Sequence, residues 1–417
     1  LDESELKMQI YIKTENQDNN MVMQKSFKFR IYPIRKQEKR LEKCLDQACF
    51  LYNQLLDIHQ QVYLGEERTL TEFDMNNLLK DFETPNLHSQ TKQNIPKRIS
   101  DAFNHFFRKV KSKEKEKGFP KFKKRVFYTS LTFPQYKQEI VGDRLYISKV
   151  GMIRMVKHRE IEGEIKTLTI KKENEEWYAT FSCENVPTEE PVIEFERETE
   201  GLDVGINKFL FCSDGREFDN PNFLKRSEKR LKRFQRRLSK KKKGSANRKK
   251  ARIKLNILHT KIKRQREDFH KKLARKLAME IKIIGIENLN IQGMVKNHHL
   301  AKSISDVGWG SFFSYLKYYK TIFGGEIIEI GMFEPTSQIC SDCGHKQKID
   351  LKQRTFECEN CGMIKERDLN SSINIQKLVK QKLNNTVGQT EFQARGLDVR
   401  PSMKAIEVEA GNYRRIA

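Results

Sequence analysis

The sequence has no long hydrophobic run. Among its 417 residues, no stretch approaches the roughly 18 apolar residues that span a bilayer, and the best local run, 283–286, has the length of a strand. The first residues are polar and acidic, and they show no secretory signal. These absences argue against an integral membrane protein, and we expect no membrane partner.

Cysteine is scarce for a chain of this length. Eight cysteines do not make a disulfide scaffold. Four of them are scattered, at Cys44, Cys49, Cys183 and Cys212, while the other four are concentrated within 22 residues near the C-terminus. This asymmetry predicts a reducing compartment and one metal site.

Acidic residues are few relative to basic ones. The chain has 56 Asp and Glu against 81 Lys and Arg, which leaves a net charge of +25. Between residues 225 and 254, 17 of 30 residues are basic and Glu228 is the one acid. A general basic character is one interpretation of the total charge, but such clustering favours a polyanionic partner.

The hydrophobic pattern divides the first half of the chain into a leader, strands and a helical insertion. Residues 1–22 form a polar leader that we expect to be disordered. Alternating apolar residues predict a strand ending near Pro33, and further short strands follow at 125–190. We expect 23–34 and 125–190 to pair into one small β-barrel, with a helical insertion at 35–124 between them.

An α/β domain is predicted for the second half, after an acidic linker at 191–200. The domain would occupy 201–338 and 363–395, and the tail at 396–417 looks weakly structured. The elements expected there are strands at 201–212, 281–286 and 326–331, a basic helical pair at 222–280 that breaks at 243–246, and helices at 306–323 and 368–378.

The clustered cysteines form two knuckles with metal-ligand spacing. Cys340 and Cys343 make the first Cys-x-x-Cys pair, Cys358 and Cys361 make the second, and 14 residues separate the pairs. Four thiolates at this spacing predict a tetrahedral, structural Zn²⁺ in a ribbon at 339–362. A redox pair is the alternative, and a catalytic zinc is disfavoured because four thiolates leave no open position.

Three carboxylates lie at positions that suggest a catalytic role. Asp203 lies inside an apolar strand, Glu287 ends the strand at 281–286, and Asp368 opens a helix. Singly, they could be a turn residue, a surface charge and a helix cap. Together, acids from two strands and one helix could converge on two Mg²⁺ ions roughly 4 Å apart and hydrolyse a nucleic-acid backbone.

The motifs around these residues resemble one family. Gly-Leu-Asp203-Val-Gly, Ile-Gly-Ile-Glu287-Asn-Leu, the cysteine knuckles and Arg-Asp368-Leu-Asn-Ser-Ser occur in this order. This arrangement resembles the transposon-encoded TnpB family of RNA-guided DNA endonucleases, which are related to the type V CRISPR effectors. The resemblance covers most of the chain from about residue 23 to 400, and segments 117–123 and 300–312 also look like family segments.

The resemblance implies a multidomain fold of α/β plus β-barrel. It implies an RNase H-like RuvC nuclease domain carrying Asp203, Glu287 and Asp368, with an inserted zinc ribbon, and a β-barrel wedge domain with an inserted helical recognition domain. It further implies a guide RNA from the end of the element and a double-stranded DNA target beside a short adjacent motif. The expected location is the cytoplasm, with association with the nucleoid on binding DNA, and we expect a monomer.

Other functions stay open. A relative can act as a nuclease-silent guided repressor, although all three acids are present here. A compact CRISPR-associated effector of the same fold and a guide-free zinc-ribbon protein that binds nucleic acid are the further alternatives.

Nucleic-acid contacts are implied at several positions. The resemblance places Arg354 near the scissile phosphate; the alternative is a solvated arginine. It also places Tyr52, Asn53 and Gln93 at the adjacent DNA motif, and the alternative for Tyr52 is a core aromatic residue. Lys121 and Lys123 alternate with aromatic residues, which suits contact with a strand or RNA, or a docking loop. In the basic helical pair, phosphate contacts are expected from Lys232, Arg233, Arg236, Arg237, Lys240, Lys241 and Lys242.

Overall fold

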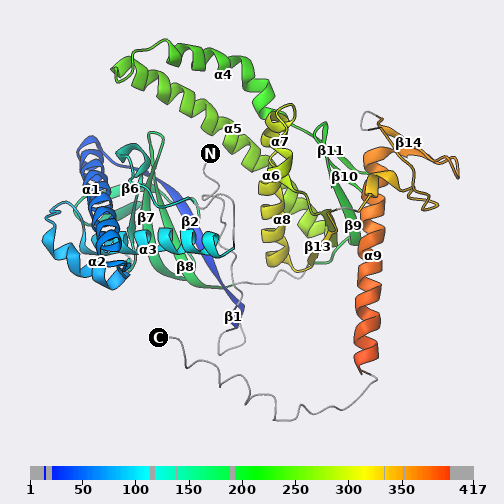
Figure 1. Cartoon of the computed structure of the whole chain (residues 1–417), viewed down its shortest axis with the longest axis horizontal. Helices are drawn as coiled ribbons and strands as arrows, with labels where there is room; N and C mark the ends of the chain where they lie inside the picture. The colour runs from blue at the N-terminus through cyan, green and yellow to red at the C-terminus, as the bar shows by residue number, and fades with distance from the viewer. Residues whose placement is uncertain are drawn as a thin grey trace. The chain divides into compact units, whose positions relative to one another are not determined.

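The computed structural model describes residues 14–15, 21–112, 118–137, 140–187, 193–332, 334–350 and 353–394. The chain divides into two compact units, one made of residues 1–189 with 231–260 and the other of 190–230 with 261–417 (Figure 1). Most of the predicted leader and all of the predicted tail at 396–417 lie outside the described residues.

The first unit contains an eight-stranded sheet with β2 (Met21–Tyr32) at its centre. Its order is β3-β7-β8-β2-β6-β5-β4, all neighbours are antiparallel, and β1 (Thr14–Glu15) pairs with β2. Phe27, Phe29 and Ile31 on β2 are buried, as their alternation predicts. The other strands are β3 (Ser130–Phe133), β4 (Ile140–Val141), β5 (Arg144–Ile147), β6 (Gly151–Val156), β7 (Glu164–Glu173) and β8 (Glu176–Pro187).

The pairing of the first strand with the later strands is confirmed, but closure into a barrel is not. Over the described part of the chain, the path of the sheet ends in β3 on one side and β4 on the other. These edge strands have four and two residues, so they offer little backbone for a closing ladder. The sheet is therefore a half-barrel. β2 also begins at Met21, inside the predicted leader.

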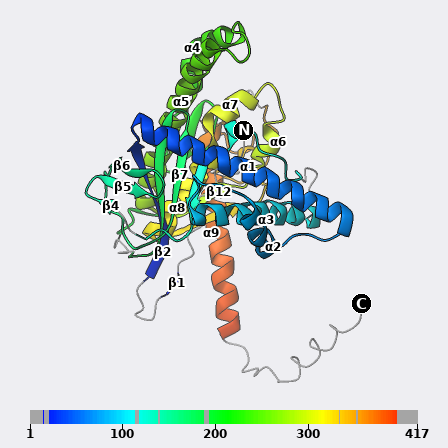
Figure 2. The same cartoon turned by 90° about the vertical axis from the view of Figure 1, so that its left-hand side faces the viewer.

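Three helices form the insertion of the first unit: α1 (Arg35–Glu66), α2 (Glu72–Leu78) and α3 (Ser89–Lys111). They pack together beside the sheet (Figure 2). α2 was not expected, although Thr71 and Asp74 form a capping box at its start. Short 3₁₀ turns lie at Leu79–Asp81 and Arg125–Phe127.

The second unit contains a five-stranded mixed sheet in the order β11-β10-β9-β12-β13. β9, β12 and β13 are parallel, while β10 and β11 are antiparallel additions. The strands are β9 (Arg197–Val204), β10 (Lys208–Cys212), β11 (Glu217–Asp219), β12 (Ile281–Glu287) and β13 (Glu326–Ile330). β9 begins within the predicted linker at 191–200, of which residues 191–192 lie outside the described residues.

Helices cover both faces of this sheet. On one face, Leu202 and Ile286 pack with Phe312 and other core residues of α5, α7 and α8, while Ile375 and Val379 of α9 pack on the opposite face. The helices are α4 (Phe223–Ser239), α5 (Ala246–Glu280), α6 (Ile291–Met294), α7 (Ala301–Val307), α8 (Trp309–Phe323) and α9 (Arg367–Ala394). Residues 231–260 of α4 and α5 belong to the first unit.

Helix boundaries differ from the prediction in two places. The helix expected at 306–323 is two helices, because Gly308 adopts a left-handed conformation (φ 67°) that ends α7 and precedes α8. The helix expected at 368–378 extends to Ala394. In the parts of the chain that the structure describes, no helix has the length and apolar character needed to cross a bilayer.

The cysteine segment contains a small antiparallel hairpin of β14 (Thr355–Glu357) and β15 (Ile364–Glu366). β15 pairs with β14, so the hairpin continues past the predicted ribbon boundary at 362. A 3₁₀ turn at Thr336–Gln338 leads into the segment from β13.

Candidate active site and zinc site

Two glycines allow α9 to lie directly on the sheet. Gly201 of β9 and Gly285 of β12 are partners in the parallel ladder. A Cβ atom on Gly201 would lie 2.1 Å from the Ser372 carbonyl oxygen, and one on Gly285 would lie 2.6 Å from Cγ2 of Val379. Any side chain at either position would therefore push α9 away from the strands.

The same register places two carboxylates side by side. Leu202 pairs with Ile286, so the next residues along the two strands, Asp203 and Glu287, are neighbours. Leu202 and Ile286 face the core on one side of the sheet. Because side chains alternate along a strand, Asp203 and Glu287 face the other side, where α9 lies. Asp368 is the second residue of α9 and completes the group.

The three acids interact electrostatically. Burial raises the pKa of Asp203 well above its ordinary value, and the nearby charges of Glu287 and then Asp368 raise it further. A hydrogen bond with Ser371 and the charge of Arg367 act in the opposite direction. The site therefore holds more negative charge than its own cations neutralise, and an added cation would be stabilised there.

Two hydroxyl groups connect the carboxylates. The Thr336 hydroxyl donates to Oε1 of Glu287 at 2.6 Å, and Oγ of Ser371 lies 3.0 Å from Oγ1 of Thr336. Ser371 is also the hydrogen-bond partner of Asp203. Neither residue was expected from the sequence, although Ser371 follows Asp368 by three positions, which places both on one helix face.

Arginine side chains lie beside Asp368. Nε of Arg367 is 3.3 Å from Oδ1 of Asp368, and Nη1 of Arg354 is 3.9 Å from Oδ2. The Arg354 side chain is 54% exposed, so this ion pair contributes little to stability and leaves the guanidinium accessible. The structure thus places Arg354 at the carboxylate group; its role in catalysis stays a prediction.

The carboxylates are spread more widely than the thiolates. In the described ranges, the four cysteines are the one group of three or more potential ligands whose donor atoms all lie within 4.8 Å of one another. The oxygen atoms of Asp203, Glu287 and Asp368 are therefore not all within 4.8 Å of one another.

The cysteine group fits one tetrahedral zinc ion. Sγ of Cys340 lies 3.7 Å from Sγ of Cys361, and Sγ of Cys343 lies 3.5 Å from Sγ of Cys358. Zn–S bonds of about 2.3 Å at tetrahedral angles require S···S separations of about 3.8 Å. Asn360 and the His345 backbone N–H lower the pKa of the Cys343 thiol to about 6, whereas hydrogen bonds with the other three cysteines raise the pKa of the Cys361 thiol.

Asparagines of α9 hold the first knuckle against the active site. Oδ1 of Asn370 accepts from the Ser341 backbone N–H at 2.8 Å, and its Nδ2 donates to the Ile339 carbonyl at 2.7 Å. Asn374 donates to the carbonyls of Thr336 and Ile339. The zinc segment and the helix that carries Asp368 are therefore joined by buried hydrogen bonds.

Family models match three parts of the chain. The model OrfB_IS605, described as "Probable transposase", matches residues 181–298, its helix-turn-helix domain matches 21–67, and the Cas12f1-like TNB domain matches 309–375. A relative from Streptomyces pristinaespiralis, named "Putative RNA-guided DNA endonuclease", is 29% identical over 365 residues, which are 85% of this chain and 89% of that protein. The chain is therefore similar to the OrfB/TnpB proteins over most of its length.

Other relatives extend this similarity. The protein InsQ of Escherichia coli K12, with the same "RNA-guided DNA endonuclease" name, is 28% identical and covers 84% of this chain and 91% of its own length. Among solved structures, CasPhi-2 bound to crRNA matches with a TM-score of 0.42 and 10% identity, over 88% of this chain and 98% of that one.

Two residues that the family resemblance assigned to the adjacent DNA motif make contacts within the protein. Tyr52 is 1% exposed and packs against Tyr128 in the core of the first unit, which is the core position left open as its alternative. Both ends of the Asn53 amide bind the backbone of Lys123, at 3.0 Å and 2.8 Å. Asn53 thus holds the 118–124 loop on α1.

The other predicted contact residues lie at the surface. Gln93, Lys121 and Lys123 are exposed on the first unit. The predicted residues of α4 and of the turn that follows it are also exposed, namely Lys232, Arg233, Arg236, Arg237, Lys240, Lys241 and Lys242. Their contacts with nucleic acid stay predictions.

Proposed function

We propose that this protein is an RNA-guided endonuclease that cleaves double-stranded DNA next to a short adjacent motif. The observation that carries the proposal is the group of Asp203, Glu287 and Asp368, which come from two parallel strands and one helix. The pKa of Asp203 is raised by burial and then by the charges of Glu287 and Asp368. The names of the relatives from Streptomyces and Escherichia coli support the same activity.

The residues of the site suit hydrolysis of a phosphodiester. Two Mg²⁺ ions held by Asp203, Glu287 and Asp368 would activate the attacking water and stabilise the leaving oxygen. Thr336 and Ser371 fix the directions of the Glu287 and Asp203 carboxylates through their hydroxyls. The exposed Arg354 guanidinium beside Asp368 would stabilise the negative charge of the pentacoordinate phosphorus.

We assign further roles to the other parts of the chain. The half-barrel would act as the wedge domain and α1–α3 as the inserted recognition domain. Of Tyr52, Asn53 and Gln93, the residues proposed for the adjacent motif, Gln93 is the exposed one. The basic faces of α4 and α5 would follow the backbone of the guide RNA and its heteroduplex with DNA. The zinc ion is structural, and the working form is a monomer that acts in the cytoplasm on nucleoid DNA.

The decisive experiment compares two acidic residues of the same sheet. Protein purified with its bound RNA is given matched double-stranded DNA and Mg²⁺. We expect Asp203→Ala to abolish cleavage while the bound RNA is retained, and Glu326→Ala, at an exposed position of β13, to cleave like the unmodified protein. Residual cutting by pure Asp203→Ala protein would refute the catalytic assignment.

A second outcome of this experiment would distinguish a nuclease-silent repressor from a nuclease. If the unmodified protein binds its guided DNA target tightly and leaves it intact in Mg²⁺, the chain is a guided DNA-binding protein without nuclease activity. Absence of any co-purifying RNA would reject guidance itself.

A further inference from the structure

The open seam of the half-barrel contains a cavity of about 420 Å³ that has no place in the function proposed above. β3 and β7 form one side of it, β5 forms the other, and the start of α3 covers one end. One hydrogen bond crosses the seam, from the Tyr136 hydroxyl to the Tyr146 carbonyl at 3.0 Å. The failure of the two sheet edges to pair leaves room for a ligand.

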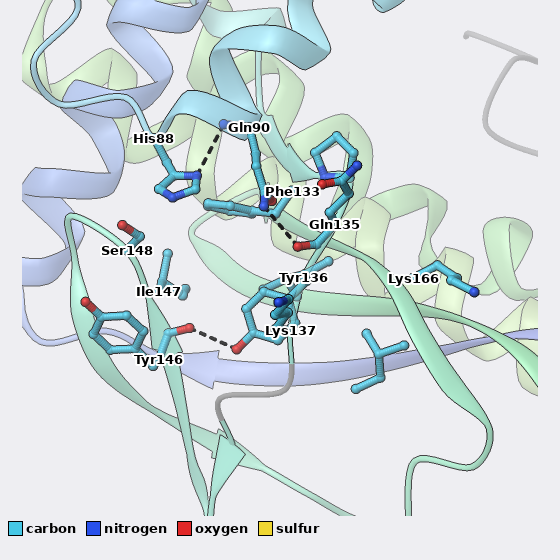
Figure 3. A pocket seen from close by; sticks show the side chains of 13 residues that line it. His88, Gln90, Phe133, Gln135, Tyr136, Lys137, Tyr146, Ile147, Ser148 and Lys166 are labelled. Carbon is cyan, nitrogen blue, oxygen red and sulfur yellow. Dashed lines mark hydrogen bonds between the residues drawn. The ribbon is translucent and has the colours of Figure 1, made fainter.

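Aromatic rings and apolar side chains form the walls. Figure 3 shows His88 and Phe133 on one side of the hollow and Tyr136 and Tyr146 on the other. The ring centroids of His88 and Phe133 are 5.9 Å apart. Such surfaces favour a flat, aromatic ligand.

Polar groups at the edge of the cavity can form further hydrogen bonds. Nδ1 of His88 accepts from the Gln90 backbone N–H at 3.3 Å, which places the proton of the neutral ring on Nε2. In the described structure, Nε2 of His88 and the hydroxyls of Tyr146 and Ser148 have no hydrogen-bond partner. A ligand with hydrogen-bonding edges would satisfy all three.

The charge of the lining is positive. Lys137 and Lys166 are its basic residues besides His88, and no described lining residue is an aspartate or glutamate. Lys166 is ion-paired with Glu164 and Glu184, whereas Lys137 has no ion-pair partner in the described residues. An anionic group on the ligand would therefore lie near Lys137.

A second hollow of about 560 Å³ adjoins the cavity, and Gln90, Pro134 and Gln135 line both. Lys80, Lys92 and Lys97 are among its lining residues, with Glu72 as its one acidic residue among those described. Lysines beside an aromatic cavity suit a strand with a phosphate backbone better than an isolated small molecule.

We propose that this cavity, lined by His88, Phe133, Tyr146 and Ser148, binds one unstacked nucleobase of a bound nucleic-acid strand, with the adjoining phosphate at Lys137. The base would stack on the aromatic walls, and its polar edge would meet Nε2–H of His88 and the Ser148 hydroxyl. This inference rests on the proposed function, because a guide RNA and a target DNA are the two sources of such a base.

The test uses the full chain with its guide RNA and four variants. Tyr146→Ala removes an aromatic wall and Lys137→Glu reverses the charge, and both positions are exposed, so the fold is retained. Tyr318→Ala on α8 and Lys296→Glu in the exposed turn after α6 are the controls, because neither lies in an element assigned to nucleic-acid contact. Affinity is measured first for the guide RNA and then, for the guide complex, for matched DNA without Mg²⁺.

We expect each cavity variant to lose about tenfold or more in affinity for one strand, as removal of a base-stacking ring does elsewhere, while both controls bind normally. Loss of RNA affinity assigns the base to the guide, and loss of DNA affinity alone assigns it to the target. If both affinities are unchanged in a complex that binds and cuts DNA, the inference is overturned and the proposed function stands. If the unmodified protein binds no RNA, the proposed function fails, and the inference fails with it.

Discussion

Replacing Gly201 by alanine should slow cleavage without altering any polar group of the site. In the native structure, a Cβ atom at this position would lie 2.1 Å from the Ser372 carbonyl oxygen and 2.6 Å from the Gln376 backbone nitrogen. Real Cβ atoms essentially never approach closer than 3.0 Å, so α9 must retreat from β9 by about 0.9 Å at the first contact. Backbone atoms are the obstacle, and they cannot rotate away as a side chain can.

The retreat of α9 would carry Asp368 with it, since Asp368 lies one turn before Ser372 on the same helix. A displacement near 1 Å at a catalytic group can reduce a rate about 100-fold. Overpacking of this kind also costs about 1–3 kcal/mol of folding free energy. We therefore expect slow cleavage by a protein that remains folded and retains its guide RNA.

The assay is single-turnover cleavage of guided DNA in saturating Mg²⁺, with thermal unfolding measured on the same samples. Gly310→Ala is the matched control, because a Cβ atom there would meet Cδ1 of Ile291 at an ordinary 3.7 Å. Cleavage by folded Gly201→Ala protein at the rate of the Gly310→Ala protein would refute the role of close helix packing.

Three further outcomes are expected. In magnesium-free buffer, Asp203→Asn should unfold at a higher temperature than the unmodified protein, and the difference in unfolding temperature should widen as pH rises. The raised native pKa of Asp203 stabilises the unmodified protein at low pH, and this stabilisation disappears once the native carboxyl must ionise. A difference that is independent of pH would contradict this. Cys343→Ser should reduce bound zinc from one ion to none, measured by elemental analysis, and reduce cleavage about tenfold or more, since Asn370 joins the first knuckle to α9; full activity without zinc would exclude the coupling. Replacing Lys240, Lys241, Lys242 and Lys243 by serine should reduce the slope of log affinity against log salt by about 0.9 for each phosphate that these lysines neutralise, and an unchanged slope would remove this turn from the interface.

Much of the fold was predictable because local patterns determine local structure. The alternation of Phe27, Phe29 and Ile31 predicts a strand with one buried face, and the structure buries all three. The turn signals at 243–246 separate two helices, and α4 and α5 end and begin on either side of them. Closure of the barrel was not predictable, since it depends on whether two short edges, distant in sequence, meet in space.

The same contrast applies to Tyr52 and Asn53. Helical spacing allows Tyr52 to be a core residue or a surface contact, and only the packing of α1 against Tyr128 decides that it is buried. The hydrogen bonds of Asn53 involve Lys123, which is 70 residues later in the chain. No local pattern contains such a pairing.

The sequence alone determines the types of ligand and their order along the chain. These are four thiolates in two short loops and three acids, one inside a strand, one at a strand end and one at a helix start. The thiolates are close in sequence, so their spacing predicts a metal site directly, and the structure brings their sulfur atoms within 4.8 Å of one another. The acids are far apart in sequence. Only the tertiary structure decides that they meet, because their meeting depends on α9 lying against the bare backbone of Gly201 and Gly285 and on the Thr336 and Ser371 hydroxyls between the carboxylates.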